Sequence, residues 1–173
     1  MLFQIVSDIH IEREEVLLNW RDVLTPSSPV LIIAGDFGNI QDIEKYTTYI
    51  SNKCEEPMYT HLIIIVGNND VYSTSYLLLQ LQKFSYSIPK LTFLNNQFID
   101  IGEYRLYGST LFSYIPEDFR VKILPIMTHE NKYANVSWIN REYFNNVYFI
   151  EENIVKAQED LSLIHISEPT RPY

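Results

Sequence analysis

Three apolar runs, each followed directly by a polar motif, constrain the fold of this chain more than any other feature. The runs cover residues 2–6, 30–34 and 62–66, and they are rich in the β-branched residues that suit buried strands. The motifs that follow them are Ser7-Asp8-Ile9-His10, Gly35-Asp36-Phe37-Gly38-Asn39 and Gly67-Asn68-Asn69-Asp70. About one strand–helix–strand unit separates consecutive motifs. The repetition predicts a parallel α/β sheet with polar side chains at its strand ends, where such sheets place ligands.

The segments between and after the motifs complete this prediction. Apolar residues at helical spacing predict helices at about 40–52 and 73–85, whereas residues 12–24 read as a helix or a loop. Short strand candidates at 90–94, 97–101 and 104–107 predict a second, partly antiparallel sheet. From residue 115 to 160 the chain has few glycines and an apolar helical face, which indicates further helix.

Length and composition limit the class of protein. A chain of 173 residues, 46% apolar and 20% charged, is typical of one folded globular domain. The net charge of −9 disfavours nucleic acid as a partner, so a nuclease acting on DNA ends would need a basic groove or a partner domain that the sequence does not show.

Cysteine usage and hydropathy bear on the compartment. The single Cys54 excludes an internal disulfide framework and fits a reducing environment. The first residues lack a basic leader, and no apolar stretch approaches the length that spans a bilayer. We therefore expect a cytoplasmic protein with no membrane partner. The sequence leaves the oligomeric state open.

Residues 161–173 resemble a sequencing-library adapter translated in frame. We interpret them as a non-native tail, and a natural amphiphilic tail is the alternative. The adapter interpretation makes residues 1–160 a partial domain whose C-terminal part is missing. It also means that His165 carries no functional information.

The polar motifs contain the donor atoms of a metal site. Asp8 and His10 are two residues apart, so on an extended backbone both side chains point to one side and can share a cation. Asp36 follows Gly35, which permits a tight turn and close approach to a metal or phosphate. With the side-chain oxygen of Asn68, these groups suit hard or borderline divalent metals. Each motif alone is also typical of a turn or a helix N-cap, but three in order at strand ends favour the metal site.

The three motifs together resemble the first three sequence blocks of the calcineurin-like metallophosphoesterases. The stretch from Tyr104 to Phe112 is similar to a Gly-x-Thr-Leu-Trp strand in one branch of that family, so the likeness covers roughly residues 2–112. The resemblance implies a two-sheet α/β/β/α sandwich. It also implies two divalent metal ions, Mn, Fe or Zn. In that arrangement the ligands of the first ion are Asp8 and His10, Asp36 bridges the two, and Asn68 binds the second.

The family chemistry is hydrolysis of a phosphomonoester or phosphodiester by metal-bound hydroxide. Two metals about 3.5–4 Å apart clamp a phosphoryl group and generate that hydroxide from water. The resemblance therefore implies that the full-length parent protein is an enzyme that acts on a phosphorylated small molecule or a nucleotide, and it leaves the activity of the present chain open. The alternative is a catalytically degenerate family member that serves as a protein-binding scaffold, in which the full-length gene would also lack the later histidines of the family.

Two departures from the family pattern bear on activity. Asn69 stands where the family usually has a histidine that assists the leaving group, and an amide cannot donate a proton at useful pH. Some active members have cysteine there, so we retain Asn69 and the adjacent Asp70 as candidate catalytic residues. The later family blocks supply three more histidine ligands. Between Asp70 and the tail only His129 offers one, as a fourth-block ligand or as a surface or helix-cap residue, and His61 reads as structural.

Overall fold

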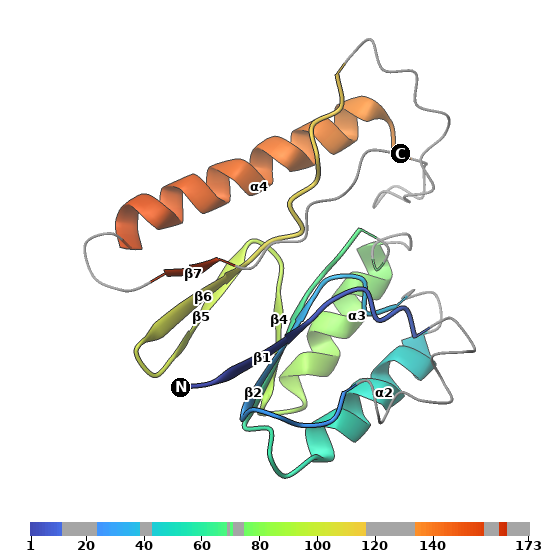
Figure 1. The fold of residues 1–173 in the computed structure, drawn as a ribbon. Coiled ribbons are helices and arrows are strands. Elements are labelled where there is room, and N and C mark those ends of the chain that lie inside the picture. Colours follow the sequence, from blue (N-terminus) through green and yellow to red (C-terminus); the bar gives the residue numbers. More distant parts are fainter. Residues whose placement is uncertain are drawn as a thin grey trace.

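Two β-sheets packed face to face, with helices on both outer sides, make up the fold (Figure 1). A computed structural model describes residues 1–11, 24–38, 43–68, 70, 75–116, 134–157 and 163–165. The parallel sheet has the order β1-β2-β3-β4, with strands β1 (Phe3–Val6), β2 (Val30–Ala34), β3 (His61–Ile65) and β4 (Leu91–Leu94). The second sheet contains β5 (Gln97–Ile101), β6 (Tyr104–Gly108) and β7 (Leu163–His165).

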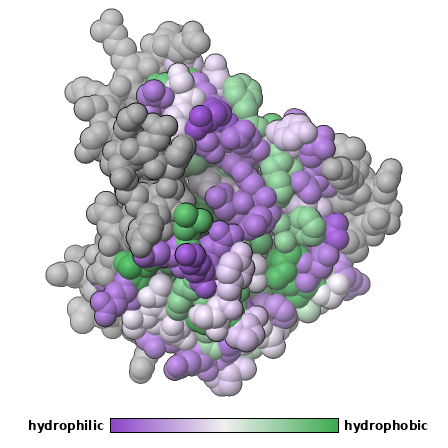
Figure 2. Space-filling view, turned by 180° about the vertical axis from the view of Figure 1, so that it is seen from behind, coloured by the Kyte–Doolittle hydropathy of each residue, from purple (hydrophilic) through white to green (hydrophobic). Residues whose placement is uncertain are grey.

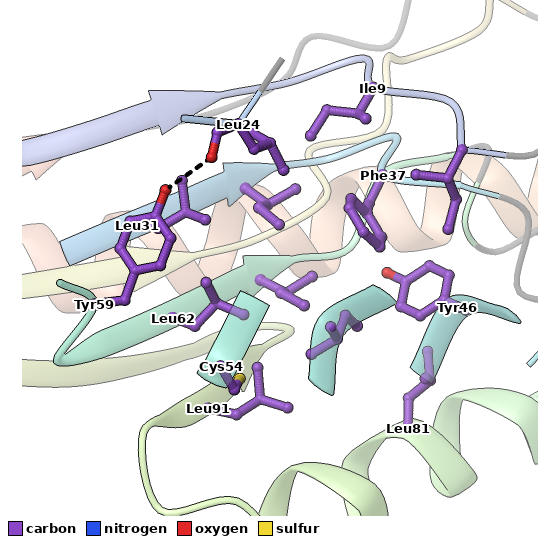
Figure 3. Packing of buried hydrophobic residues seen from close by; sticks show 14 residues of the cluster. Ile9, Leu24, Leu31, Phe37, Tyr46, Cys54, Tyr59, Leu62, Leu81 and Leu91 are labelled. Carbon is purple, nitrogen blue, oxygen red and sulfur yellow. Dashed lines mark hydrogen bonds between the residues drawn. The ribbon is translucent and has the colours of Figure 1, made fainter. Parts of the chain in front are cut away.

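Strands β2 and β3 are buried on both faces, which explains their unbroken apolar sequence. Leu31 and Ile33 belong to the core cluster that includes residues of helices α2 (Ile43–Glu55) and α3 (Ser75–Tyr86). The alternate residues Val30 and Ile32 pack into the cluster between the two sheets. In Figure 3 the ring of Tyr46, from α2, lies against Phe37, with their centroids 4.9 Å apart.

Helix α4 (Val136–Ala157) packs on the second sheet and completes the fourth layer. The ring of Phe149 lies 6.2 Å from that of Tyr107 in β6. Buried Asn146 of the same helix donates to Asn96 Oδ1 at 3.0 Å and accepts from the backbone N–H of Phe112 at 3.2 Å. The α/β/β/α sandwich expected from the sequence is confirmed.

The prediction that residues 90–94 belong to the second sheet was wrong. Strand β4 pairs with β3 in parallel, with Leu62 opposite Leu91. The chain changes sheets one turn later, where Asn96 has a φ of 52°. Apolar strand residues indicate a strand but do not identify its partner, and β4 is reached through α3, which returns the chain in the parallel direction.

Some expectations fall on residues whose structure is not described. These are residues 12–23, Asn69, and residues 117–133 with His129. Strand β7 lies within the tail interpreted as non-native and pairs in parallel with β6, and the origin of that tail stays a prediction.

Within the described part of the chain, no helix combines the length and the apolar character needed to cross a membrane. Hydrophobic residues (green) and hydrophilic residues (purple) are interspersed over the rear face of the molecule (Figure 2).

Candidate metal centre

The carboxyl ends of three neighbouring parallel strands bring the first two polar motifs together and set the third beside them. Asp8 follows β1, Asp36 follows β2 and Asn68 follows β3, and these strands are adjacent in the sheet. The loops after β1 and β2 remain paired beyond the strands. The backbone N–H of Asp8 donates to Gly35 O at 3.2 Å, and that of His10 donates to Asp36 O at 3.1 Å.

The backbone at the site is left-handed rather than extended. The φ angles of Asp8, His10 and Asp36 are 54°, 51° and 48°, and Gly35 has a φ of 86°. The extended geometry expected for Asp8 and His10 is therefore wrong, because the strand ends at Val6 and the alternation of side chains ends with it. Left-handed conformations are uncommon outside glycine, and such strain concentrates at functional sites.

The side chains of Asp8, His10 and Asp36 converge despite this difference. Each offers a ligand atom, and these atoms lie within 4.8 Å of one another. His10 Nε2 is 4.0 Å from Asp36 Oδ2, and the Ser7 hydroxyl donates to Asp8 Oδ2 at 2.7 Å. Asp8 is exposed, His10 is half-buried and Asp36 is buried, so the cluster opens to solvent on one side.

This donor set fits a divalent cation. Two carboxylates and an imidazole are ligands that Mn²⁺, Fe²⁺ and Zn²⁺ accept. Two atoms bonded to one such ion lie at most about 4.4 Å apart, so small side-chain rotations bring the observed cluster to bonding distance. The cluster is therefore a candidate metal centre assembled from two segments that are distant in sequence.

The third motif contributes a buried loop. Asn68 is buried next to the end of β3, and its part in a second metal site stays a prediction. Behind it, the Thr110 hydroxyl donates to Val66 O at 2.7 Å, which fixes the end of β3 from the second sheet. This role of Thr110 was not predicted from the sequence, although the Gly-x-Thr-Leu motif was the signal that could have revealed it.

Asp70 is completely buried, with an exposed fraction of 0%. Its Oδ1 accepts the backbone N–H of Gly38 at 2.9 Å and its Oδ2 accepts that of Gly67 at 2.8 Å. Burial raises the pKa of Asp70 to about 7, the backbone N–H donors of Gly38 and Gly67 act against the rise, and the negative charge of Asp36 adds to it. The structure thus places this carboxylate in the interior, between the backbone N–H groups of Gly38 and Gly67.

Tyr46 is also connected with the site, and nothing in the sequence indicated this. It lies on the apolar face of α2 and is fully buried. Burial raises the pKa of its hydroxyl well above the ordinary value, and the charges of Asp70 and Asp36 add to the rise. Among the described residues the hydroxyl has no hydrogen-bond partner. Helical spacing indicates on which face of the helix this tyrosine lies, but it does not indicate that the charges of two carboxylates act on its hydroxyl.

Comparisons with known proteins bear on the family and on the fold. The family model described as calcineurin-like phosphoesterase matches residues 1–168. One solved crystal structure is similar with a TM-score of 0.61 at 13% sequence identity, over 98% of this chain and 68% of that one. At that identity the likeness concerns the fold. No curated protein sequence matches the chain.

Proposed function

Because the chain belongs to the calcineurin-like phosphoesterase family, we propose that it hydrolyses a phosphomonoester or phosphodiester in a metal-dependent reaction. The observation that carries the proposal is the cluster of Asp8, His10 and Asp36, whose ligand atoms lie within 4.8 Å of one another. The proposed substrate is a phosphorylated small molecule or a nucleotide, met in the cytoplasm.

The three residues of the cluster would hold the first of two cations, and Asp36 would share the second with Asn68. The candidate metals are Mn, Fe and Zn, which accept oxygen and imidazole donors. When bound, the metal supplies Lewis-acid stabilisation of the phosphoryl group and activates water. The exposed Asp8 side of the cluster leaves room for a substrate phosphate to approach from solvent.

The leaving group is where this chain would differ from most of its family. Asn69 can donate a hydrogen bond to a leaving oxygen, but it cannot supply a proton. We therefore propose that the enzyme favours substrates with good leaving groups, such as aryl phosphates. Alkyl phosphates would react slowly, because their leaving oxygen needs a proton.

The test is Mn²⁺-dependent turnover of three defined phosphoesters by the purified chain. We expect hydrolysis of p-nitrophenyl phosphate or bis-p-nitrophenyl phosphate, and little of glycerol phosphate. His10→Ala should lower kcat/KM by about 100-fold, because it removes the imidazole of the cluster. Asp100→Asn is the matched control, since this aspartate lies on β5 with a half-exposed side chain paired with Arg105. Equal activity in wild type and His10→Ala would contradict the proposal, as would wild-type protein that binds Mn²⁺ but hydrolyses none of the three substrates.

A further inference from the structure

The buried carboxylate of Asp70 joins the loop that carries Asp36 of the candidate metal centre to the loop that carries Asn68, the proposed ligand of a second ion. Gly38, which donates to Oδ1 at 2.9 Å, lies in the loop that contains Asp36. Gly67, which donates to Oδ2 at 2.8 Å, precedes Asn68. The backbone N–H of Phe37 also lowers the pKa of this carboxyl group. Each oxygen therefore has a donor from a different loop, and the carboxylate spans the gap between them.

Asp70 cannot act directly on a substrate while it holds this position. It is 0% exposed, whereas Asp8 in the cluster is exposed. Burying a carboxylate is unfavourable unless its oxygens are hydrogen-bonded, and here both oxygens accept backbone N–H groups. Hydrogen bonds from backbone N–H to a carboxylate are roughly twice as strong as neutral ones, so the two loops are held firmly.

We propose that Asp70 is a positioning residue, whose carboxylate fixes the separation of the loop of Asp36 from the loop of Asn68. This inference rests on the proposed function, because the loops matter to catalysis only as carriers of metal ligands. Some groups do not bind the metal but orient its ligands through hydrogen bonds, and removal of such a group typically lowers metal affinity 10- to 100-fold.

Asp70→Asn isolates this role because it keeps the volume of the side chain. An amide presents one oxygen and one NH₂ group, so its NH₂ must face the N–H of either Gly38 or Gly67. One loop then loses its acceptor and meets a second donor. The other loop can keep its bond, so the expected defect is a changed separation rather than loss of both attachments.

The experiment measures Mn²⁺ affinity by titration calorimetry on wild type, Asp70→Asn and the control Asp100→Asn, well below the unfolding temperature of each. We expect Asp70→Asn to weaken Mn²⁺ binding 10- to 100-fold. Asp100→Asn should bind like wild type. A purely structural role predicts a lower unfolding temperature for Asp70→Asn with unchanged Mn²⁺ affinity of the folded protein, and that result would overturn the proposal.

A second measurement on the wild-type protein covers the case in which Asp70→Asn does not fold. Hydrogen exchange of the Gly38 and Gly67 amides should be slow before any Mn²⁺ is added, because both donate to a buried acceptor. Exchange at the rate of an open loop would refute the attachment. Wild type that binds Mn²⁺ but hydrolyses no phosphoester refutes the proposed function alone, since the ratio of affinities still tests Asp70.

Discussion

Gly108 of β6 packs against Leu94 and Ile65 of the parallel sheet, and its replacement by alanine gives a quantitative test of the fold. A Cβ at this position would lie 2.3 Å from Leu94 Cβ and 3.1 Å from Ile65 Cγ1. Ordinary carbon contacts are about 3.5–4.0 Å, so β6 would have to move away from β4 by more than about 1 Å. Leu94 Cβ is attached to the backbone and cannot rotate away.

We expect Gly108→Ala to lower the free energy of unfolding by about 3 kcal/mol, the upper part of the range for overpacked cores. For a domain of this size, that corresponds to a fall in Tm of about 6–12 °C. The same displacement should weaken the Thr110–Val66 hydrogen bond, because Thr110 lies two residues after the end of β6.

The assay is urea and thermal unfolding followed by circular dichroism, with Gly102→Ala as the matched control. Gly102 lies in the exposed turn between β5 and β6, and within the described part of the chain a Cβ there meets only Met1 Cε, at 3.7 Å. Its φ of 62° is left-handed, so alanine should cost about 1 kcal/mol from backbone strain alone. If Gly108→Ala destabilised the protein no more than Gly102→Ala, the close packing of the two sheets would be refuted.

Three further predictions concern single side chains. Tyr46→Phe should leave the free energy of unfolding unchanged or raise it by up to about 1 kcal/mol, because the buried hydroxyl has no hydrogen-bond partner among the described residues. If urea unfolding showed a loss above about 2 kcal/mol, the hydroxyl would have a partner. Burial raises the pKa of Cys54 to about 11, against the opposing positive charge of Lys90. At pH 8 iodoacetamide should therefore alkylate Cys54 about 100-fold more slowly in native than in urea-unfolded protein, and equal rates would contradict its burial. Asn69→His should raise turnover of alkyl phosphates by up to roughly 10²–10⁴-fold, and no gain would count against protonation as the limiting step.

The strands of the parallel sheet could be predicted from the sequence because their residues are both apolar and β-branched. The observed bounds of β2, Val30–Ala34, match the apolar run, and β3 ends one residue short of it. The partner of residues 90–94 could not be predicted in this way. Strand propensity describes how a segment fits a pleated surface, whereas pairing depends on how α3 and the following turn direct the chain.

The residues of the candidate metal cluster could be identified from the sequence, but their backbone geometry could not. Asp8, His10 and Asp36 follow strands whose carboxyl ends meet, and this places them together. Their left-handed φ angles depend on hydrogen bonds between the two loops, such as His10 N–H to Asp36 O, which local sequence does not specify. The burial of Asp70 was hidden for the same reason, because a carboxylate in a turn motif normally faces solvent.

Metal content is the measurement that tests the central claim most directly. Wild type and Asp36→Asn would be loaded separately with Mn²⁺, Fe²⁺ and Zn²⁺, freed of excess ion and analysed by elemental mass spectrometry. We expect stoichiometric metal in wild type and its loss in Asp36→Asn, because Asp36 is the buried carboxylate of the cluster and lies 4.0 Å from His10. Wild type that retains none of the three ions, or a variant that retains as much as wild type, would contradict the assignment of a metal centre to these residues.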